Sequence, residues 1–420
     1  MDHKCSRLFV FACSLICAQE VFAAKPYFDP QPDWPPRPFD ELNGRKLEFF
    51  AHGSRPEWGY ADRHEDLFAV VHPKTDRRDA PLVVVLHSAG HDLMSCLKCV
   101  RQEGNHDIYR TPDTVYALYL DCRYNTKTDW WWGDPKREFP GFDLTPTEKR
   151  LMDTVRWAIA AYGIDTNRVY LCGNSMGGSG TLGLGLRHGD VFAAIKANVP
   201  AGVEHACNRL GDGGLPAGAA LPEPPVCVDY SSQSDTWSKN HERLIRLMHE
   251  RRYSYLLFWG CFGHDNNNET IAQYNDIIHD FDWLSIRKDE AYPVFTDATC
   301  DNAHPWPVQL REDGKNPVNA KAGQINGFFR WKVMSQSATR LEMRLWLAAP
   351  KTKFAPLRAP EAATATVTLR RLGALAPKAG ERLTWRFGDR QGAAEGDVVT
   401  LGALGITRQP QVLSVTKEAR

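Results

Sequence analysis

Residues 169–180 constrain the fold more than any other stretch of this chain. They read VYLCGNSMGGSG, an apolar and β-branched run followed by Gly173-x-Ser175-x-Gly177 and a series of small residues. This is the pattern of a strand that turns sharply into a helix around one serine, with glycines where the backbone passes itself closely. The glycine-serine spacing is common on its own, but the strand before it and the small residues after it make it specific. We therefore predict that Ser175 is presented at the end of a buried strand.

Strand and helix patterns alternate on both sides of this stretch. Residues 82–86 (LVVVL) form a continuous apolar run, as expected for a central strand buried on both faces. Thr145-Pro146-Thr147-Glu148 has the composition of a capping-box helix start, and apolar residues follow at helical spacing as far as Gly163. Further strands are predicted at residues 45–52, 67–72, 114–121, 192–199, 226–230 and 253–259, and helices at residues 238–251 and 268–282. This alternation indicates an α/β class with a mostly parallel sheet covered by helices.

The sequence changes character near residue 320. Apolar residues at 341, 343, 345 and 347, and again at 365, 367 and 369, alternate with period two, and Pro and Gly turns separate such segments. We expect a C-terminal antiparallel β-sandwich here. The expected organisation is a signal peptide at residues 1–24, a catalytic domain with an extended proline-rich lead-in at 25–300, a linker at 301–322 and the β-sandwich accessory domain at 323–420.

Charge and the N-terminal segment restrict the partners and the compartment. The chain has 51 basic and 51 acidic residues, so no net field favours nucleic acid or an anionic membrane. Lys4 and Arg7 precede an apolar run at residues 8–18, and Val21-Phe22-Ala23 follows, which is the pattern of a cleaved secretory signal. The run is too short to span a bilayer. We expect a secreted or periplasmic protein with no nucleic-acid or membrane partner, and the sequence does not reveal its oligomeric state.

Eight cysteines remain beyond the expected signal peptide, an even number suited to an oxidising compartment. Cys207 and Cys227 flank a loop rich in Gly, Pro and Ala, and we expect them to form a disulfide. Cys261 with Cys300 is a second expected pair, and Cys172 is expected to be a buried thiol. The Cys96-x-x-Cys99 pair also fits a redox site or half of a zinc site, but the sequence has no second Cys-x-x-Cys. No metal site is therefore expected.

Three side chains with the chemistry of a hydrolase each follow a separate predicted strand. They appear in the order Ser175, Asp235, His264, that is nucleophile, acid and base. A serine hydroxyl is a poor nucleophile at neutral pH, so it needs an imidazole to take its proton and a carboxylate to orient that imidazole. The carboxyl ends of parallel strands meet at one edge of a sheet, so we predict that these residues form a catalytic triad. The alternatives are Asp229 or Asp265 as the acid, and His279 or His304 as the base.

An oxyanion needs two further donors. One is expected to be the backbone N–H of Met176, directly after the nucleophile, and the other an amide of Ser88 or Ala89, which follow the strand at 82–86. The segment His87-Ser88-Ala89-Gly90 stands where lipases and esterases carry a His-Gly-Gly-Gly turn, but it differs at two positions. The choice between the two amides therefore stays open.

Trp130, Trp131 and Trp132 stand in the loop after the strand at 114–121. They are expected to include a platform on which substrate sugar rings stack. The alternative is that at least one of them faces the core, and all three are not expected to face a ligand.

The catalytic half resembles the secreted α/β-hydrolase serine esterases of the polyhydroxybutyrate-depolymerase, feruloyl-esterase and prolyl-oligopeptidase-like group. The resemblance rests on Asp165-x-x-Arg168-Val169-Tyr170 leading into Gly173-Asn174-Ser175-Met176-Gly177-Gly178, and on Gly263-His264. Phe281-Asp282-Trp283-Leu284, followed by a β-rich tail, is similar to extracellular bacterial esterases that act in polysaccharide breakdown. The resemblance covers residues 65–300. It implies an α/β-hydrolase fold, the triad Ser175, Asp235 and His264, no cofactor, and esters of plant-type glycans as substrates.

The expected function is that of a secreted serine esterase acting on acyl or methyl esters of a polysaccharide or oligosaccharide. One alternative is a serine peptidase for short peptides, which would usually carry an upstream β-propeller that this chain has no room for. The other is an inactive glycan-binding protein on a hydrolase scaffold. For the C-terminal sandwich we expect a structural role, because Trp331, Trp346 and Trp385 are too far apart in sequence to indicate an aromatic platform.

Overall fold

The structure is a computed structural model of the chain. It describes residues 28–30, 41–52, 55–60, 66–75, 77–101, 109–122, 130–133, 142–233, 235, 237–238, 241–264, 274–302, 322–352, 354–396 and 398–418. The expected signal peptide, most of the lead-in and most of the linker at 301–322 lie outside the described residues, as do Asp265 and His304.

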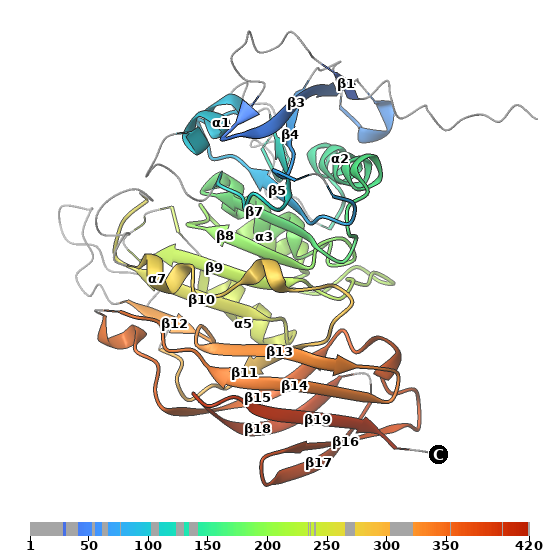
Figure 1. Ribbon diagram of the computed structural model, residues 1–420, viewed down its shortest axis with the longest axis vertical. Coiled ribbons are helices and arrows are strands. Elements are labelled where there is room, and N and C mark those ends of the chain that lie inside the picture. The colour runs from blue at the N-terminus through green and yellow to red at the C-terminus, as the bar shows by residue number, and fades with distance from the viewer. Residues whose placement is uncertain are drawn as a thin grey trace, which may run out of the picture.

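An 11-stranded sheet organises the first part of the chain (Figure 1). Its strands lie in the order β1 (Phe28–Pro30), β3 (Arg45–His52), β4 (Asp66–Val71), β6 (Tyr116–Leu120), β5 (Leu82–Leu86), β7 (Val169–Asn174), β8 (Ala194–Asn198), β9 (Val226–Ser232), β10 (Tyr255–Gly260) and β12 (Gly323–Ile325), and β2 (Glu41–Leu42) pairs with β3. The six strands from β6 to β10 are parallel, whereas β4 pairs antiparallel at one side and β12 at the other. This order, with β6 between β4 and β5, is that of the α/β-hydrolase fold and confirms the predicted fold class.

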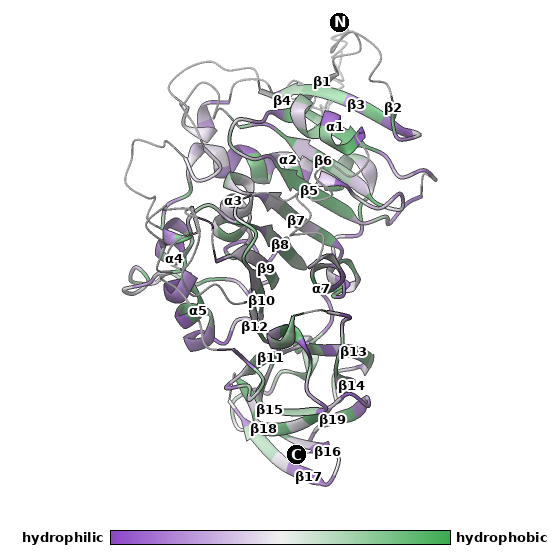
Figure 2. Cartoon of the chain, turned by 90° about the vertical axis from the view of Figure 1, so that its left-hand side faces the viewer, coloured by the Kyte–Doolittle hydropathy of each residue, from purple (hydrophilic) through white to green (hydrophobic). Residues whose placement is uncertain are grey.

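Helices cover both faces of the sheet (Figure 2). The apolar sides of α2 (Pro146–Tyr162), α3 (Met176–Gly185), α4 (Glu204–Arg209) and α5 (His241–Glu250) share one core cluster with the sheet. On the opposite face lie α1 (Leu93–Arg101), the short α7 (Asn275–Ile278) and the 3-10 turn η4 (Trp283–Ser285). The sequence analysis predicted neither α1 nor α4, and the helix expected at 268–282 is described only as α7.

Helix α2 begins as its sequence predicts, with one difference. The Thr145 side chain accepts a hydrogen bond from the Glu148 N–H at 3.2 Å, and Gly163 ends the helix with a φ of 60°. The Glu148 carboxylate, however, turns into the interior, where it pairs with Arg209 and with His188. Only the Thr145 half of the capping box is therefore formed, because the Glu148 carboxylate pairs with the buried Arg209 guanidinium instead.

The C-terminal part is a two-layer antiparallel unit, which confirms the β-sandwich. One sheet contains β11 (Tyr292–Thr296), β15 (Ala362–Arg370) and β18 (Val399–Thr407). The other contains β13 (Phe329–Gln336), β14 (Arg340–Leu347), β19 (Gln411–Lys417), β16 (Arg382–Phe387) and β17 (Arg390–Glu395). Apolar side chains of both sheets form one cluster.

The order of the strands along the chain does not follow the division into two units. Strand β11 precedes residue 300 but pairs with β15 of the sandwich, and β12 follows the expected linker but pairs with β10 of the large sheet. The chain therefore passes from the large sheet to the sandwich and back before it completes the sandwich. The boundaries at 300 and 323 stay predictions.

The expected disulfides are wrong. All eight described cysteines are free thiols. Cys207 and Cys227 are both fully buried in the helix-covered core cluster, where burial raises the pKa of each thiol. Both side chains are held apart from solvent by packing in this cluster and need no covalent closure of the loop between them. Cys261 and Cys300 are likewise unpaired.

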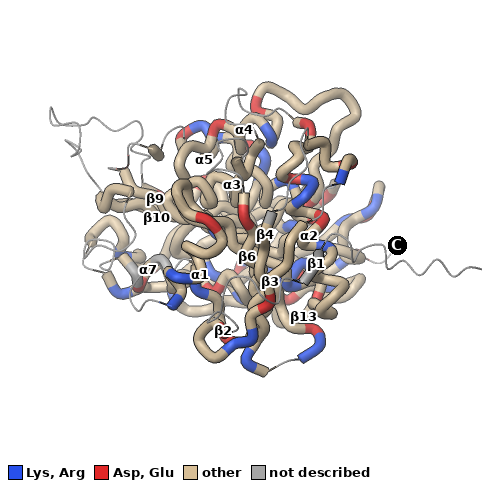
Figure 3. Tube along the Cα trace, turned by 90° about the horizontal axis from the view of Figure 1, so that it is seen from above, with Lys and Arg blue, Asp and Glu red and all other residues tan. Residues whose placement is uncertain are grey.

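Charge is distributed without a single-sign stripe in the view of Figure 3, where Lys and Arg alternate with Asp and Glu along the tube. Among the described residues, no helix is both long enough and apolar enough to cross a bilayer.

Candidate active site

Ser175 lies at the turn between β7 and α3 in a backbone conformation that few side chains adopt. Its φ is 55° and its ψ is −116°, as the strained strand-to-helix turn requires. The flanking glycines permit this turn by their small size. A Cβ on Gly177 would lie 2.2 Å from the Leu86 carbonyl oxygen, and one on Gly173 would lie 2.4 Å from the Gly177 carbonyl oxygen. The helix can therefore start directly over β5 and β7, with Ser175 at the carboxyl edge of the sheet.

The structure brings the three predicted triad residues into one hydrogen-bonded line. The Ser175 Oγ lies 2.6 Å from His264 Nε2, and His264 Nδ1 lies 2.6 Å from Asp235 Oδ2. Asp235 follows β9 and His264 follows β10, which lie two and three strands from β7 in the parallel sheet, so all three residues come from the same carboxyl edge. With a proton on Nδ1 donated to Asp235, Nε2 is free to accept the Ser175 hydroxyl proton. This arrangement can generate an activated alkoxide nucleophile.

The rival acid and base are placed elsewhere. The Asp229 carboxylate is fully buried, accepts hydrogen bonds from Tyr255 (2.7 Å) and Ser231 (3.1 Å), and lies 3.4 Å from His241 Nε2, so its described partners belong to an internal network. His279 is exposed and lines a cavity on the α7 side of the sheet, away from Ser175. The remaining rivals fall outside the described residues.

A buried polar network holds the loop that carries Asp235. His241 bridges Ser231 (2.9 Å) and Ser238 (3.1 Å), and the Ser238 N–H donates to the Asp235 carbonyl oxygen at 3.2 Å. The Asp235 Oδ1 accepts from the Trp237 N–H at 2.8 Å, which leaves Oδ2 for His264. Sequence reasoning missed this network, because its members are ordinary polar residues whose burial is visible only in the structure.

The structure separates the two candidate oxyanion amides. The Ser88 N–H donates to the Tyr109 hydroxyl at 3.0 Å, so it is not available to a substrate. Within the described part of the chain, neither the Ala89 N–H nor the Met176 N–H has an acceptor. The pair that can receive an oxyanion is therefore Met176 with Ala89.

His87 fixes the orientation of the Ser88–Ala89 peptide. Its Nδ1 donates to the Ser88 carbonyl oxygen at 2.8 Å, and its Nε2 lies 2.9 Å from Asp121 Oδ1. Burial alone would lower the pKa of His87, but Cys122 and the Asp121 carboxylate together raise it to about 10. Because the peptide is trans, holding its carbonyl toward His87 directs the Ala89 N–H the opposite way.

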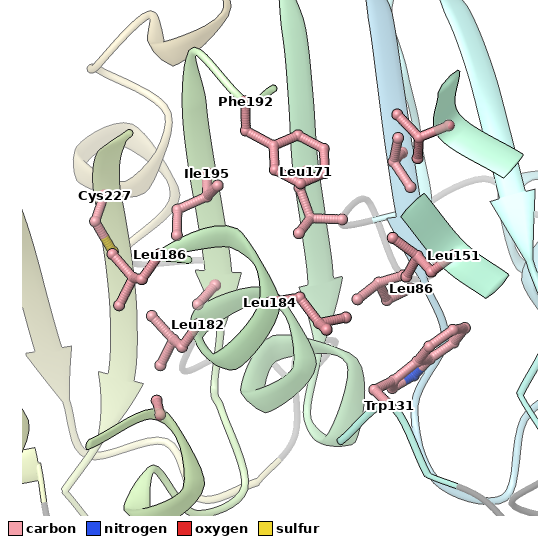
Figure 4. Packing of buried hydrophobic residues seen from close by; sticks show 14 of the residues in the cluster. Leu86, Trp131, Leu151, Leu171, Leu182, Leu184, Leu186, Phe192, Ile195 and Cys227 are labelled. Atoms are coloured by element: carbon pink, nitrogen blue, oxygen red, sulfur yellow. The ribbon is translucent and has the colours of Figure 1, made fainter. Parts of the chain in front are cut away.

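The three tryptophans do not form a common platform. Trp131 is fully buried beside Leu86 (Figure 4), and its indole N–H donates to the His87 carbonyl oxygen at 2.9 Å. Trp132 is 7% exposed and stacks on His205 with 4.5 Å between ring centroids. Only Trp130 of the three is partly exposed. The substrate role predicted for Trp131 and Trp132 is therefore wrong, since both faces of a buried indole are already occupied.

A different tryptophan is exposed next to the site. Trp237 is 65% exposed and stands two residues after Asp235. Trp237 was not among the predicted site residues, although its position two residues after the predicted acid was a usable signal. In the described residues, no group of three or more His, Cys, Asp or Glu side chains is arranged to hold a metal ion.

Comparisons with known proteins give distant structural likenesses. No family model matches the chain, and no curated protein matches its sequence. An S-formylglutathione hydrolase from Agrobacterium tumefaciens is 17% identical with a TM-score of 0.40, covering 53% of this chain and 89% of that one. A ferulic acid esterase from Anaeromyces mucronatus is 16% identical with a TM-score of 0.39, covering 61% and 98%. A fluorophosphonate-binding serine hydrolase from Staphylococcus aureus is 12% identical with a TM-score of 0.38, covering 57% and 98%. The order and directions of the strands, rather than these likenesses, identify the fold.

Proposed function

We propose that the protein is a secreted or periplasmic serine esterase that cleaves acyl or methyl esters of polysaccharides or oligosaccharides. One observation carries the proposal of a serine hydrolase: the unbroken line from the Ser175 hydroxyl through His264 to Asp235, with 2.6 Å at each step. Serine, imidazole and carboxylate in that order are the groups that acyl transfer requires.

The geometry defines a mechanism in two halves. Ser175 Oγ attacks the ester carbonyl carbon while its proton moves to His264 Nε2, and Asp235 stabilises the resulting imidazolium. The amides of Met176 and Ala89 donate to the carbonyl oxygen as it becomes negative. When the intermediate collapses, the C–O bond to the alcohol breaks and His264 returns the proton to the departing oxygen. Water then repeats the sequence on the acyl-enzyme, releasing the acid and restoring the Ser175 hydroxyl.

The glycan part of the proposal rests on exposed aromatic surface and on charge. Trp237 presents an indole beside the acid loop, and an exposed indole face is suited to stacking on a sugar ring. The balance of 51 basic and 51 acidic residues does not disfavour a neutral or mildly acidic polymer. The expected secretion would bring the protein to such a polymer.

Labelling and paired hydrolysis assays test the serine-hydrolase step. A fluorophosphonate should label the wild-type protein and not Ser175→Ala, and p-nitrophenyl acetate should be hydrolysed by the wild type alone. An aminoacyl-p-nitroanilide should be cleaved poorly. Cleavage of the anilide without the ester would favour the peptidase alternative, and no labelling with retained glycan affinity would favour the inactive binding protein.

A substrate panel tests the glycan step. Acetylated, feruloylated and methyl-esterified glycans should include at least one good substrate. Trp237→Ala should raise KM for that glycan and leave the hydrolysis of p-nitrophenyl acetate unchanged. Trp346→Ala, on β14 of the sandwich, is the matched control and should leave both unchanged. An esterase that hydrolyses small esters but no glycan ester would reject this part of the proposal alone.

A further inference from the structure

A cavity with both polar and apolar walls lies on the face of the sheet opposite α2 to α5. It has a volume of about 190 Å³, and its described walls come from β5, β7 and β8 and from the segments around residues 110–112 and 279–284. None of Ser175, Met176, Ala89 or His264 lines it. The cavity is therefore separate from the candidate active site, although β7 and β8 contribute to both.

The cavity contains a largely buried lysine that has no counter-ion in the described part of the chain. Lys196, on β8, is 8% exposed, and among the described residues no carboxylate and no hydrogen-bond acceptor meets its Nζ. The described contact is with the Tyr230 ring, whose centroid lies 5.9 Å from Nζ. Cys172, the β-sheet neighbour of Lys196, cannot compensate the charge, because burial raises the pKa of its thiol to about 12. Lysines are rarely buried unless they are paired.

A second buried polar group in the cavity also lacks a partner. Asn198 is two residues further along β8 on the same face, is 1% exposed, and its Oδ1 has no hydrogen-bond partner. Leaving such a group unsatisfied costs about 1–3 kcal/mol. A lysine without a described counter-ion and an unsatisfied amide oxygen line the same cavity, and together they point to a ligand with complementary groups.

The remaining described walls define the ligand. Arg110 and His279 add cationic or donor groups, and none of the described lining residues is acidic. Val83, Trp283 and Leu284 supply apolar surface. A cavity of about 150 Å³ accommodates a benzene ring, so this one has room for one ring or a short chain with a charged head.

We propose that this cavity binds a small organic monocarboxylate with an apolar body, whose carboxylate accepts hydrogen bonds from Lys196 Nζ. The bound anion supplies a counter-ion, and a hydroxyl or N–H group elsewhere on the ligand donates a hydrogen bond to Asn198 Oδ1. The apolar body lies against Trp283 and Leu284. Burial lowers the pKa of Lys196 to about 8, so the side chain is mostly charged at neutral pH and gains from a carboxylate. The proposal does not depend on the esterase activity.

Benzoate is the probe, and its neutral isostere benzamide is the comparison. By titration calorimetry on the full chain, benzoate should bind with one-to-one stoichiometry, at least tenfold more tightly than benzamide. Lys196→Met, which keeps the length of the side chain and removes its charge, should weaken benzoate binding at least tenfold. Lys332→Met, at an exposed lysine of β13, is the matched control and should bind as the wild type does.

Three outcomes would overturn the proposal. The first is equal benzoate affinity in wild type and Lys196→Met. The second is binding that disappears once a fluorophosphonate occupies Ser175, which would place benzoate in the active site. The third does not depend on how the variant folds: a crystal of the wild-type protein soaked in benzoate should show the carboxylate within hydrogen-bond distance of Lys196 Nζ, and water alone in the cavity would reject the site.

Discussion

Ser175, His264 and Asp235 illustrate how far single residues can be placed from sequence. Each follows a strand whose apolar run is clear, and strands of a parallel sheet end at a common edge, so their convergence was predictable. Their catalytic roles stay predictions. The choice between Ser88 and Ala89 was not predictable, because it depends on the hydroxyl of Tyr109, which packs against Ser88 from 21 residues away. The burial of Trp131 was hidden for a similar reason, since an indole serves equally well in a core and on a surface.

Replacing the acid tests the orientation of His264. Asp235→Asn keeps the shape of the side chain but removes the charge that orients and stabilises the imidazolium, so kcat for p-nitrophenyl acetate should fall on the order of 10³–10⁴-fold. KM should change little. Asp229→Asn is the control, because the Asp229 carboxylate belongs to the internal network. This variant should lower the unfolding temperature and leave kcat close to that of the wild type. A larger kcat loss in Asp229→Asn would reassign the acid.

The lowered pKa of Lys196 predicts how the free energy of unfolding depends on pH. Its pKa falls from 10.5 in the unfolded chain to about 8 in the folded protein, so below pH 8 both states are protonated and the full cost of the buried charge is present. Between pH 8 and pH 10.5 the folded state loses this proton first, and the cost declines. Lys196→Met should therefore be more stable than the wild type by about 3 kcal/mol at pH 7, with the difference shrinking toward pH 10.5.

Urea unfolding of both proteins at pH 7, 9 and 10.5 would measure this difference. Lys332→Met should show no such pH trend, because that side chain is exposed in both states. A constant difference between wild type and Lys196→Met across the series would contradict a lowered pKa.

At the scale of elements, strands with clear apolar runs and the long helix α2 could be predicted from sequence, whereas the short helices could not. Strands β3 and β5 match their predicted ranges residue for residue, and α2 begins and ends at its predicted caps. Helix α4 has six residues and α1 has nine, too few for a helical period to stand out from sequence. Their stability comes from packing against the sheet and not from local preference.

The interior ion pair between α2 and α4 should be costly to break. Glu148 is fully buried and pairs with Arg209, which is 1% exposed. Burial raises the pKa of this carboxyl, but the hydrogen bond with His188 and the charge of Arg209 bring the pKa below its ordinary value. Glu148→Gln leaves the guanidinium without its counter-charge, so unfolding free energy should fall by about 3 kcal/mol. Glu250→Gln, which breaks an exposed pair with Arg246 on α5, is the control and should cost less than about 0.5 kcal/mol. Chemical unfolding measures both, and equal losses would contradict the role of burial.

At the scale of the whole molecule, the sandwich is fastened to the amino ends of the parallel strands. Arg371, next to β15, donates to the carbonyl oxygens of Phe192, Ala193 and Pro224, which precede β8 and β9. Ser175 lies at the other end of these strands. This attachment is made away from the candidate active site, which supports a structural role for the sandwich. Leu357 of the C-terminal part, however, packs in one cluster with Phe262, two residues before His264.

Without the Arg371 hydrogen bonds, the large sheet unit and the sandwich should unfold in two separate transitions. Arg371→Met removes three charge-assisted hydrogen bonds to buried carbonyls, so stability should fall by about 3 kcal/mol. We expect calorimetry to show one transition for the wild type and two for the variant. Arg344→Met, at an exposed position of β14, is the control and should keep the single transition. Two transitions already present in the wild type would show that the units are independent.

The strand exchange between the two units has a practical consequence for anyone who dissects this protein. A fragment ending at residue 300 would retain β11 without β15 and would lose β12, the strand that pairs with β10. Strand β10 would then be an exposed edge strand, whose unpaired N–H and C=O groups can pair with another copy of the fragment. Such a fragment is expected in inclusion bodies, and a soluble minimal enzyme would have to keep residues 323–325 and a partner for β11.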